Sequence, residues 1–442
     1  MTLEELRALA SDGRIDTVVI AMCDMQGRLM GKRLTAEHFL DEVVGHGAEG
    51  CSYLLAVDVD MNTVSGYAMS SWDRGYDDFV MAPDLDTLRP VPWQPGTALC
   101  MADVTWGDGT PVPPSPRQIL RRQLDRLAER GWKAAAGTEL EFIVFRDTYE
   151  QAWHKAYREL EPANLYNVDY SLLGTARVEP LIRRIRNDMT AAGMRVEDSK
   201  GECNFGQHEV NFRYADALTA ADTHVVYKNG AKEIASQEGM AITYMAKYNE
   251  REGNSCHIHF SLQSSDGEPV FAEDEKLFHG FLAGQLACLE EMTLLLAPNI
   301  NSYKRFASAS FAPTAVAWGK DNRTCSLRVV GHGKGLRFEN RLPGGDVNPY
   351  LAIAAIIASG LHGIDAGLEL EPPLEGNAYE SDKPRVPSTL QVARDGFAAS
   401  TVAREAFGDD VVDHYLNMAD VELQAFNAAV TDWERFRGFE RL

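Results

Sequence analysis

Pairs of ionisable residues, two positions apart, recur in apolar segments of this chain. The segment GTELEFIVF carries Glu139 and Glu141, and the segment NSCHIHFSL carries His257 and His259. In a β-strand, residues i and i+2 point to the same face, so each pair shares one face and the apolar residues take the other. The alternation predicts strands whose ionisable faces turn away from the core.

Two further segments repeat this pattern. GLRFENRLPG places Arg337, Glu339 and Arg341 on one face, and GQHEVNFRY does the same for Glu209 and Asn211. For any single strand, a solvent-facing surface is a sufficient explanation of the charges. Four strands whose polar faces offer mainly Glu, His and Arg indicate a metal-dependent site instead, because crowded carboxylates repel one another unless a cation lies between them.

The residue types also indicate which ions and substrates such a site would take. Carboxylate oxygens combined with one imidazole suit Mg²⁺ or Mn²⁺ better than a structural zinc ion. Arginines beside these ligands indicate anionic substrates. The four segments therefore predict a site in which divalent cations and arginines bind negatively charged molecules.

The elements that position these residues fall into two parts of the chain. Residues 1–108 alternate short strands and turns, with two strands predicted in IDTVVIAMCDMQGRLMGKRL. The Gly- and Pro-rich segment WGDGTPVPPSPRQIL marks a boundary, after which an amphipathic helix begins with Ser115 as N-cap and Pro116 at its first position. Further helices are predicted in PLIRRIRNDMTAAG and HVVYKNGAKEIASQEG, so residues 109–442 form a second, mixed domain.

Composition excludes several classes of protein. The chain has 442 residues and a formal net charge of −22, which argues against non-specific nucleic-acid binding. No stretch approaches the roughly 18 apolar residues of a membrane span, and the polar start MTLEELRALASDG lacks the apolar core of a signal peptide. The seven cysteines are scattered without a CxxC pair. We expect a cytoplasmic protein with reduced thiols and neither nucleic-acid nor membrane partners.

The order of the motifs resembles that of the glutamine synthetase family. The matching segments are GTELEF, KGECNFGQHEVNF, CHIHFSL, YKRF, NRTCSLR and KGLRFENRLPGGDVNPYLA, and they extend over nearly the whole chain. The resemblance implies an α+β fold in which a β-grasp-like N-terminal domain, residues 1–108, precedes an α/β catalytic domain, residues 109–442. It also implies an ATP-dependent ligase that assembles into a dodecamer of two hexameric rings.

The resemblance further implies two sets of metal ligands for Mg²⁺ or Mn²⁺, with two or more ions in each site. One set would organise the glutamate side of the site and consists of Glu141, Glu202 and Glu209. The other set would hold the nucleotide phosphates and consists of Glu139, His257 and Glu339.

Substrate contacts follow from the same resemblance. The residues that would contact ATP are His259, Ser261, Arg328, Lys334 and Arg337. Those that would bind glutamate are Glu141, Gly253, Arg305 and Arg341. The catalytic arginines would be Arg305, Arg323 and Arg341. In this chemistry the γ-phosphate of ATP converts a carboxylate into an acyl phosphate, which an amine then attacks.

Two positions depart from the family where ammonium would be bound. Phe311, in RFASASFAP, and Ala68, in YAMSSW, stand where the family has acidic residues. An ammonium ion needs negative charge nearby, whereas an alkyl amine gains from apolar walls. Glu252 and Gly253 also replace an Asn-Gly pair of the family, which alters the expected contact with the amino acid.

These departures favour a ligase that joins the γ-carboxylate of L-glutamate to an organic primary amine such as ethanolamine or a polyamine. The C-terminal segment VTDWERFRGFERL resembles the members of the family with that activity. An ordinary glutamine synthetase that uses ammonia is the first alternative. A non-catalytic structural or nitrogen-sensing relative is the second, although all six expected metal ligands are present.

Overall fold

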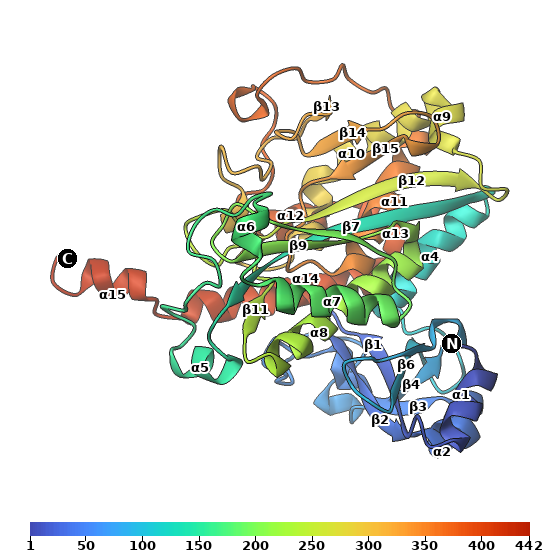
Figure 1. Ribbon diagram of the computed structural model, residues 1–442. Coiled ribbons are helices and arrows are strands. Elements are labelled where there is room, and N and C mark those ends of the chain that lie inside the picture. Colours follow the sequence, from blue (N-terminus) through green and yellow to red (C-terminus); the bar gives the residue numbers. More distant parts are fainter.

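A computed structural model describes all 442 residues and contains two separate β-sheets (Figure 1). The smaller sheet belongs to the N-terminal part and has the strand order β2-β1-β6-β4-β3, with β5 paired to β6. Its strands are β1 (Thr17–Cys23), β2 (Leu29–Thr35), β3 (Ala48–Cys51), β4 (Asp78–Pro83), β5 (Arg89–Pro90) and β6 (Thr97–Thr105). Strands β1 and β2 form the predicted hairpin.

Short helices accompany this sheet. They are α1 (Leu3–Ser11), α2 (Ala36–His38) and α3 (Val44–His46). The proposed domain boundary after residue 108 lies in the turns between β6 and the next helix, α4 (Pro116–Ala128). Helix α4 begins with the expected Pro116, but the Ser115 side chain makes no capping hydrogen bond.

The larger sheet has nine strands and carries the four polar segments side by side. Its strand order is β13-β14-β15-β12-β7-β9-β8, and β10 and β11 also pair with β7. The strands are β7 (Trp132–Phe145), β8 (Val196–Gly201), β9 (Gln207–Phe212), β10 (Ala215–Asp216), β11 (Ala241–Thr243), β12 (Cys256–Ser264), β13 (Trp318–Lys320), β14 (Leu327–Val330) and β15 (Arg337–Asn340).

Helices cover one face of this sheet. The remaining helices are α5 (Tyr149–His154), α6 (Leu172–Thr175), α7 (Glu179–Ala191), α8 (Ala217–Gln237), α9 (Val270–Glu273), α10 (Glu275–Leu296), α11 (Pro349–Asp365), α12 (Leu390–Ala399), α13 (Thr401–Phe407), α14 (Asp409–Ala428) and α15 (Asp432–Gly438). Phe260 of β12 stacks on Phe281 of α10 with ring centres 5.4 Å apart. Aromatic packing of this kind buries the apolar face and leaves the polar face open.

Helix α8 begins earlier than the sequence pattern predicted. It starts at Ala217 rather than near residue 224, because the Asp216 side chain accepts a hydrogen bond from the Thr219 backbone amide at 3.0 Å. Such a cap satisfies one of the free amides of the first turn.

A buried arginine fastens the two sheets together. The Arg117 guanidinium of α4 forms ion pairs with Asp84 and Asp103 of the N-terminal part and with Asp222 of α8. Its charge is compensated within the interior, so the N-terminal part is fixed against the larger sheet. None of the helices combines the length and apolar character needed to cross a bilayer.

Candidate active site

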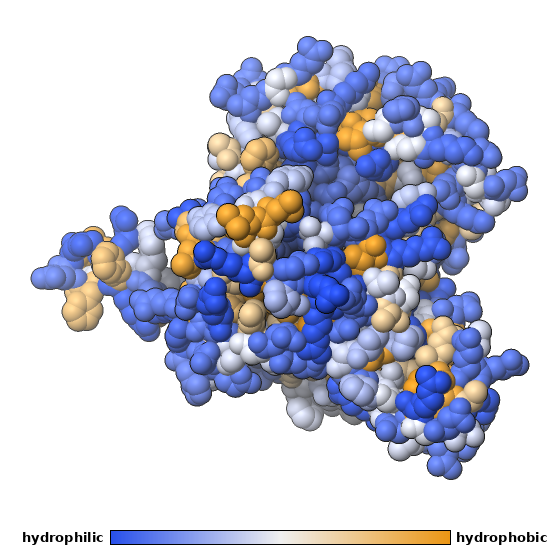
Figure 2. Space-filling model, viewed as in Figure 1, coloured by the Kyte–Doolittle hydropathy of each residue, from blue (hydrophilic) through white to orange (hydrophobic).

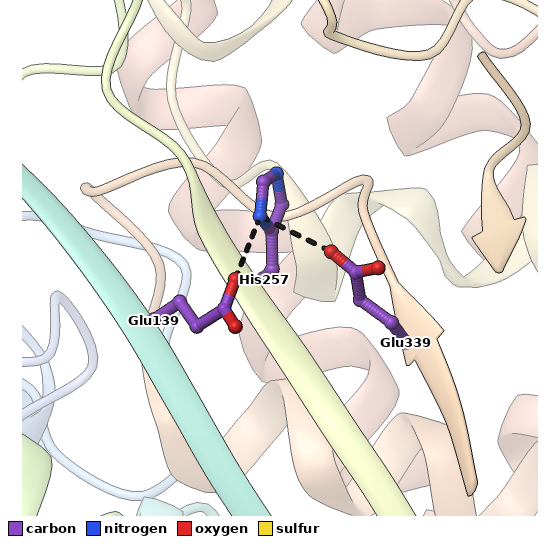
Figure 3. Close-up of side chains that lie close together, drawn as sticks. All are labelled: Glu139, His257 and Glu339. Atoms are coloured by element: carbon purple, nitrogen blue, oxygen red, sulfur yellow. Dashed lines mark hydrogen bonds and ion pairs between the residues drawn. The ribbon is translucent and has the colours of Figure 1, made fainter. Parts of the chain in front are cut away.

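Three neighbouring strands bring one imidazole and two carboxylates together. His257 on β12 stands directly opposite Glu139 on β7, and β15 on the other side of β12 supplies Glu339. The Nδ1 atom of His257 lies 3.2 Å from Glu139 Oε2 and 3.2 Å from Glu339 Oε1 (Figure 3). One imidazole nitrogen and two carboxylates suit a hard divalent cation, so these residues fit the predicted nucleotide-side metal site.

A second group contains three carboxylates. Glu141 of β7 is the register partner of Glu209 of β9, and Glu202 follows the end of β8, the next strand. Their oxygen atoms lie within 4.8 Å of one another. Glu141 is fixed by hydrogen bonds from the Ser255 amide at 2.7 Å and from Gln207 Nε2 at 3.0 Å.

Electrostatics distinguishes the two groups. Burial and the neighbouring carboxylates raise the pKa of Glu141, and the same causes raise the pKa of Glu209 to about 8. In the other group, burial would raise the pKa of Glu139, but hydrogen bonds from His257 and His259 outweigh it and lower that pKa. The triple-carboxylate group thus repels itself, and a bound cation would relieve this repulsion.

A cavity of about 600 Å³ lies over both groups. A second cavity of about 370 Å³ meets it at Glu139 and contains four of the residues predicted to contact ATP, namely His259, Ser261, Lys334 and Arg337. The fifth, Arg328, lines the larger cavity, where it forms ion pairs with Glu339 and Asp321. The two cavities provide adjoining spaces for a nucleotide and for a smaller second substrate.

Two of the predicted catalytic arginines line the larger cavity. Arg323 is exposed at its edge. Arg341 is buried, pairs with Glu339 and donates to the Phe311 carbonyl at 3.3 Å. Its Nε atom is buried without a hydrogen-bond partner, so it retains a donor for an anionic ligand.

Arg305 does not line the cavity. It is only 1% exposed, and its Nη2 atom donates to the backbone carbonyls of Arg341, Leu342 and Pro343. Burial lowers the pKa of Arg305 to about 10. The buried Nε atom has no partner. A direct contact between this guanidinium and a substrate would need a rearrangement of the adjoining loop.

The remaining predicted positions separate into two groups. Gly253 lines the large cavity, where an added Cβ would lie 2.7 Å from the Arg305 side chain and 2.2 Å from the Ala246 carbonyl oxygen. Phe311 also lines it, is 58% exposed and has a left-handed backbone with φ 58°. Ala68 is exposed elsewhere on the chain and does not reach the cavity.

Sequence reasoning missed part of the cavity wall. Asp169, Tyr170 and Lys200 all line it next to Glu202. Lys200 could have been identified, because it lies two positions before Glu202. Residues 169–170 gave no local signal, since they precede a short helix in an irregular segment and reach the site only through the folded chain.

Comparisons with known proteins agree with this geometry. The model of the family "Glutamine synthetase, catalytic domain" matches residues 113–437. The γ-glutamylethanolamide synthetase GlnA4 of Streptomyces coelicolor is 66% identical, over 100% of this chain and 96% of that protein. The glutamate–isopropylamine ligase of a Pseudomonas species is 38% identical, over 98% of this chain and 97% of that protein.

A solved structure has the same fold. The GmaS/ADP complex in conformation 1 superposes with a TM-score of 0.87 at 27% identity, covering 98% of this chain and 99% of that chain. The α+β fold class predicted from the sequence is confirmed by this match.

Proposed function

We propose that this chain, which belongs to the glutamine synthetase family and is an ATP-dependent glutamate–amine ligase, uses ethanolamine as its acceptor amine. The observation that carries the proposal is the 66% identity, along the whole chain, to a γ-glutamylethanolamide synthetase. Phe311 supports it, because this residue lines the cavity and stands at a position where the family resemblance leads us to expect an acidic residue. The products would be γ-glutamylethanolamide, ADP and phosphate.

The reaction would proceed in two steps. An oxygen of the glutamate γ-carboxylate bonds to the γ-phosphorus of ATP. The bond from that phosphorus to the bridging oxygen breaks, and this oxygen leaves as part of ADP. The nitrogen of ethanolamine then attacks the acyl carbon, and the carbon–oxygen bond to phosphate breaks as the amide forms. The nitrogen attacks with its lone pair, so the ammonium proton leaves to solvent before the attack, and the nitrogen loses one further proton to solvent as the amide forms.

The residues of the chain have distinct parts in these steps. Members of this family use divalent metals, and we propose that Mg²⁺ or Mn²⁺, held by the two ligand sets, neutralises charge on the phosphates and the carboxylate. Arg323 and Arg341 would bind the oxygens of the transferred phosphoryl group. Gly253 would contact the amino-acid end of glutamate, and the absence of a Cβ there lets the Arg305 side chain pack closely behind it.

An amine panel tests the proposed acceptor. Phosphate release with ethanolamine should exceed that with ammonium, putrescine, spermidine and isopropylamine, each compared by kcat/KM at saturating ATP and glutamate. Mass spectrometry of the product should identify γ-glutamylethanolamide. Ammonium that is used at least as efficiently as every organic amine would establish ordinary glutamine synthetase activity instead.

Arg305 is predicted to support glutamate binding. Its guanidinium fixes the backbone around Arg341, which lines the cavity, and its side chain packs against Gly253 of the same cavity. Arg305→Ala should therefore raise the KM for glutamate roughly 100-fold while changing the KM for ATP much less. Arg404, a partly exposed arginine of α13 that pairs with Asp409 and Asp413 and does not line the cavity, provides the control variant Arg404→Ala. A weakened response to ATP with an unchanged response to glutamate would contradict the role.

We also propose assembly into a dodecamer of two hexameric rings in the cytoplasm. Helix α15 stands away from the body of the molecule (Figure 1), and its aromatic residues are exposed. Trp72, near Ala68, is also exposed, and neither residue reaches the cavity of its own chain. In the dodecamer, the loop around Ala68 would complete the active site of a neighbour.

Light scattering tests this assembly. A particle of twelve chains is expected, and dilution to subunits should reduce activity. A fully active monomer would exclude a shared site.

A further inference from the structure

One wall of the large cavity has no predicted substrate group apart from Phe311. The cavity is lined by the six predicted metal ligands, by the arginines Arg323, Arg328 and Arg341, and by Glu252, Gly253 and Ser255. The remaining wall includes the end of β8, Phe311 and five residues of the segment before and in α6, namely Asp169, Tyr170, Ser171, Leu172 and Thr175. An amine that attacks the γ-carbonyl from the side away from the phosphate would lie against this wall.

Lys200 belongs to that wall and is the single lysine among the residues that line the cavity. It lies on β8 opposite Glu209 of β9. Its Nζ atom forms an ion pair with Glu202, is 3.6 Å from Asp169 Oδ1, and lies 4.7 Å from the centre of the Tyr170 ring. An ammonium at this distance from an aromatic face is attracted to it, so three neighbours fix the charge in place.

Asp169 is held from two directions. Lys200 contacts one of its oxygens, and the Cys203 thiol donates to the other over 3.7 Å. The next residue, Tyr170, has a left-handed backbone with φ 53°, which a tyrosine seldom adopts unless surrounding structure imposes it. The wall therefore contains a carboxylate that can accept hydrogen bonds but whose charge is compensated by Lys200.

The rim beyond this wall is apolar. Figure 2 shows an orange patch over α6, where Leu172 and Leu173 are exposed. An acceptor with carbon atoms between two polar ends would contact apolar surface at the rim and hydrogen-bonding groups further in. Both Asp169 and Glu202 pair with Lys200, so a second ammonium that approaches Asp169 also meets the charge of Lys200.

We propose that Lys200 is a specificity-determining residue that selects an amine with a neutral hydroxyl tail over diamines and polyamines. Putrescine carries a second ammonium at neutral pH, and that charge would lie near the Lys200 ammonium while Asp169 is already paired. Repulsion at such a partly exposed site corresponds to roughly tenfold in kcat/KM. A hydroxyl group needs only one hydrogen-bond partner. This inference rests on the proposed use of ethanolamine.

The test compares putrescine with ethanolamine in the full-length enzyme. In Lys200→Met, Asp169 becomes available to a second ammonium, so the ratio of kcat/KM for putrescine to that for ethanolamine should rise about tenfold or more. Lys200→Arg keeps the charge and should keep the wild-type ratio. The double variant Lys200→Met with Asp169→Asn should lose the gain, because the carboxylate is absent.

An equal ratio in Lys200→Met and Lys200→Arg would overturn the inference while leaving the ethanolamine assignment intact. If the wild type prefers ammonium or putrescine to ethanolamine, the proposed use of ethanolamine is wrong, and the inference that rests on it is wrong as well. If Lys200→Met does not fold, the single variant Asp169→Asn decides: putrescine should then inhibit ethanolamine turnover more weakly than in wild type, and unchanged inhibition would contradict the inference.

Discussion

Replacing His257 with alanine is expected to reduce phosphate release by at least about 1,000-fold, which corresponds to about 4 kcal/mol of transition-state stabilisation. His257 lies between Glu139 and Glu339, with Nδ1 close to both carboxylates. Its removal therefore takes the only nitrogen ligand out of the proposed nucleotide-side metal site. Glu141→Gln should have a similar effect, because the triple-carboxylate group loses one charge. Phosphate release at saturating Mg²⁺ or Mn²⁺ is the measurement.

A matched variant separates the loss of a ligand from general disturbance of the cavity. Asp198 lines the same cavity but belongs to neither ligand set, so Asp198→Asn removes a carboxylate charge without removing a proposed ligand. Circular dichroism should show that all three variants are folded. Chelation of the wild type should abolish activity, and adding back Mg²⁺ or Mn²⁺ singly shows which ion restores it. Near-full activity of His257→Ala would make the ligand assignment wrong.

The polar faces of the strands could be predicted because alternation in a strand is a local property. Glu139 and Glu141 share a face whatever the rest of the chain does. That Glu139 stands opposite His257 and Glu141 opposite Glu209 depends on register between strands that are distant in the sequence. No local pattern specifies this, so only the ordered resemblance of motifs suggested which residues would meet.

Other features depend on tertiary contacts that motifs do not contain. The YKRF motif suggested a substrate role for Arg305, but not that its guanidinium would be satisfied by three backbone carbonyls. Alignment likewise placed Ala68 in the acceptor pocket, although the loop lies outside the cavity of its own chain. The contact of Lys200 with Asp169 joins residues from a strand and an irregular loop. In each case the decisive interaction is a long-range one.

Phe311 is where a single substitution should change the acceptor most. Its side chain lines the cavity, and 58% of it is exposed, so a glutamate there can reach an incoming ammonium. Phe311→Glu should raise the ratio of kcat/KM for ammonium to that for ethanolamine by about tenfold, since a carboxylate attracts the ammonium ion and solvent screens part of that attraction. Phosphate release with each amine, at saturating ATP and glutamate, measures the ratio.

Two further variants test whether charge or pocket size excludes ammonium, and whether the loop around Ala68 of a neighbouring subunit reaches the cavity. Phe311→Gln removes the aromatic ring without adding charge, so it should weaken ethanolamine use without improving the use of ammonium. Ala68→Asp, added to Phe311→Glu, should increase the shift only if the loop of a neighbouring subunit reaches the cavity, because Ala68 does not reach it within one chain. The same gain with Phe311→Gln as with Phe311→Glu would show that pocket size, rather than negative charge, excludes ammonium from the wild-type site.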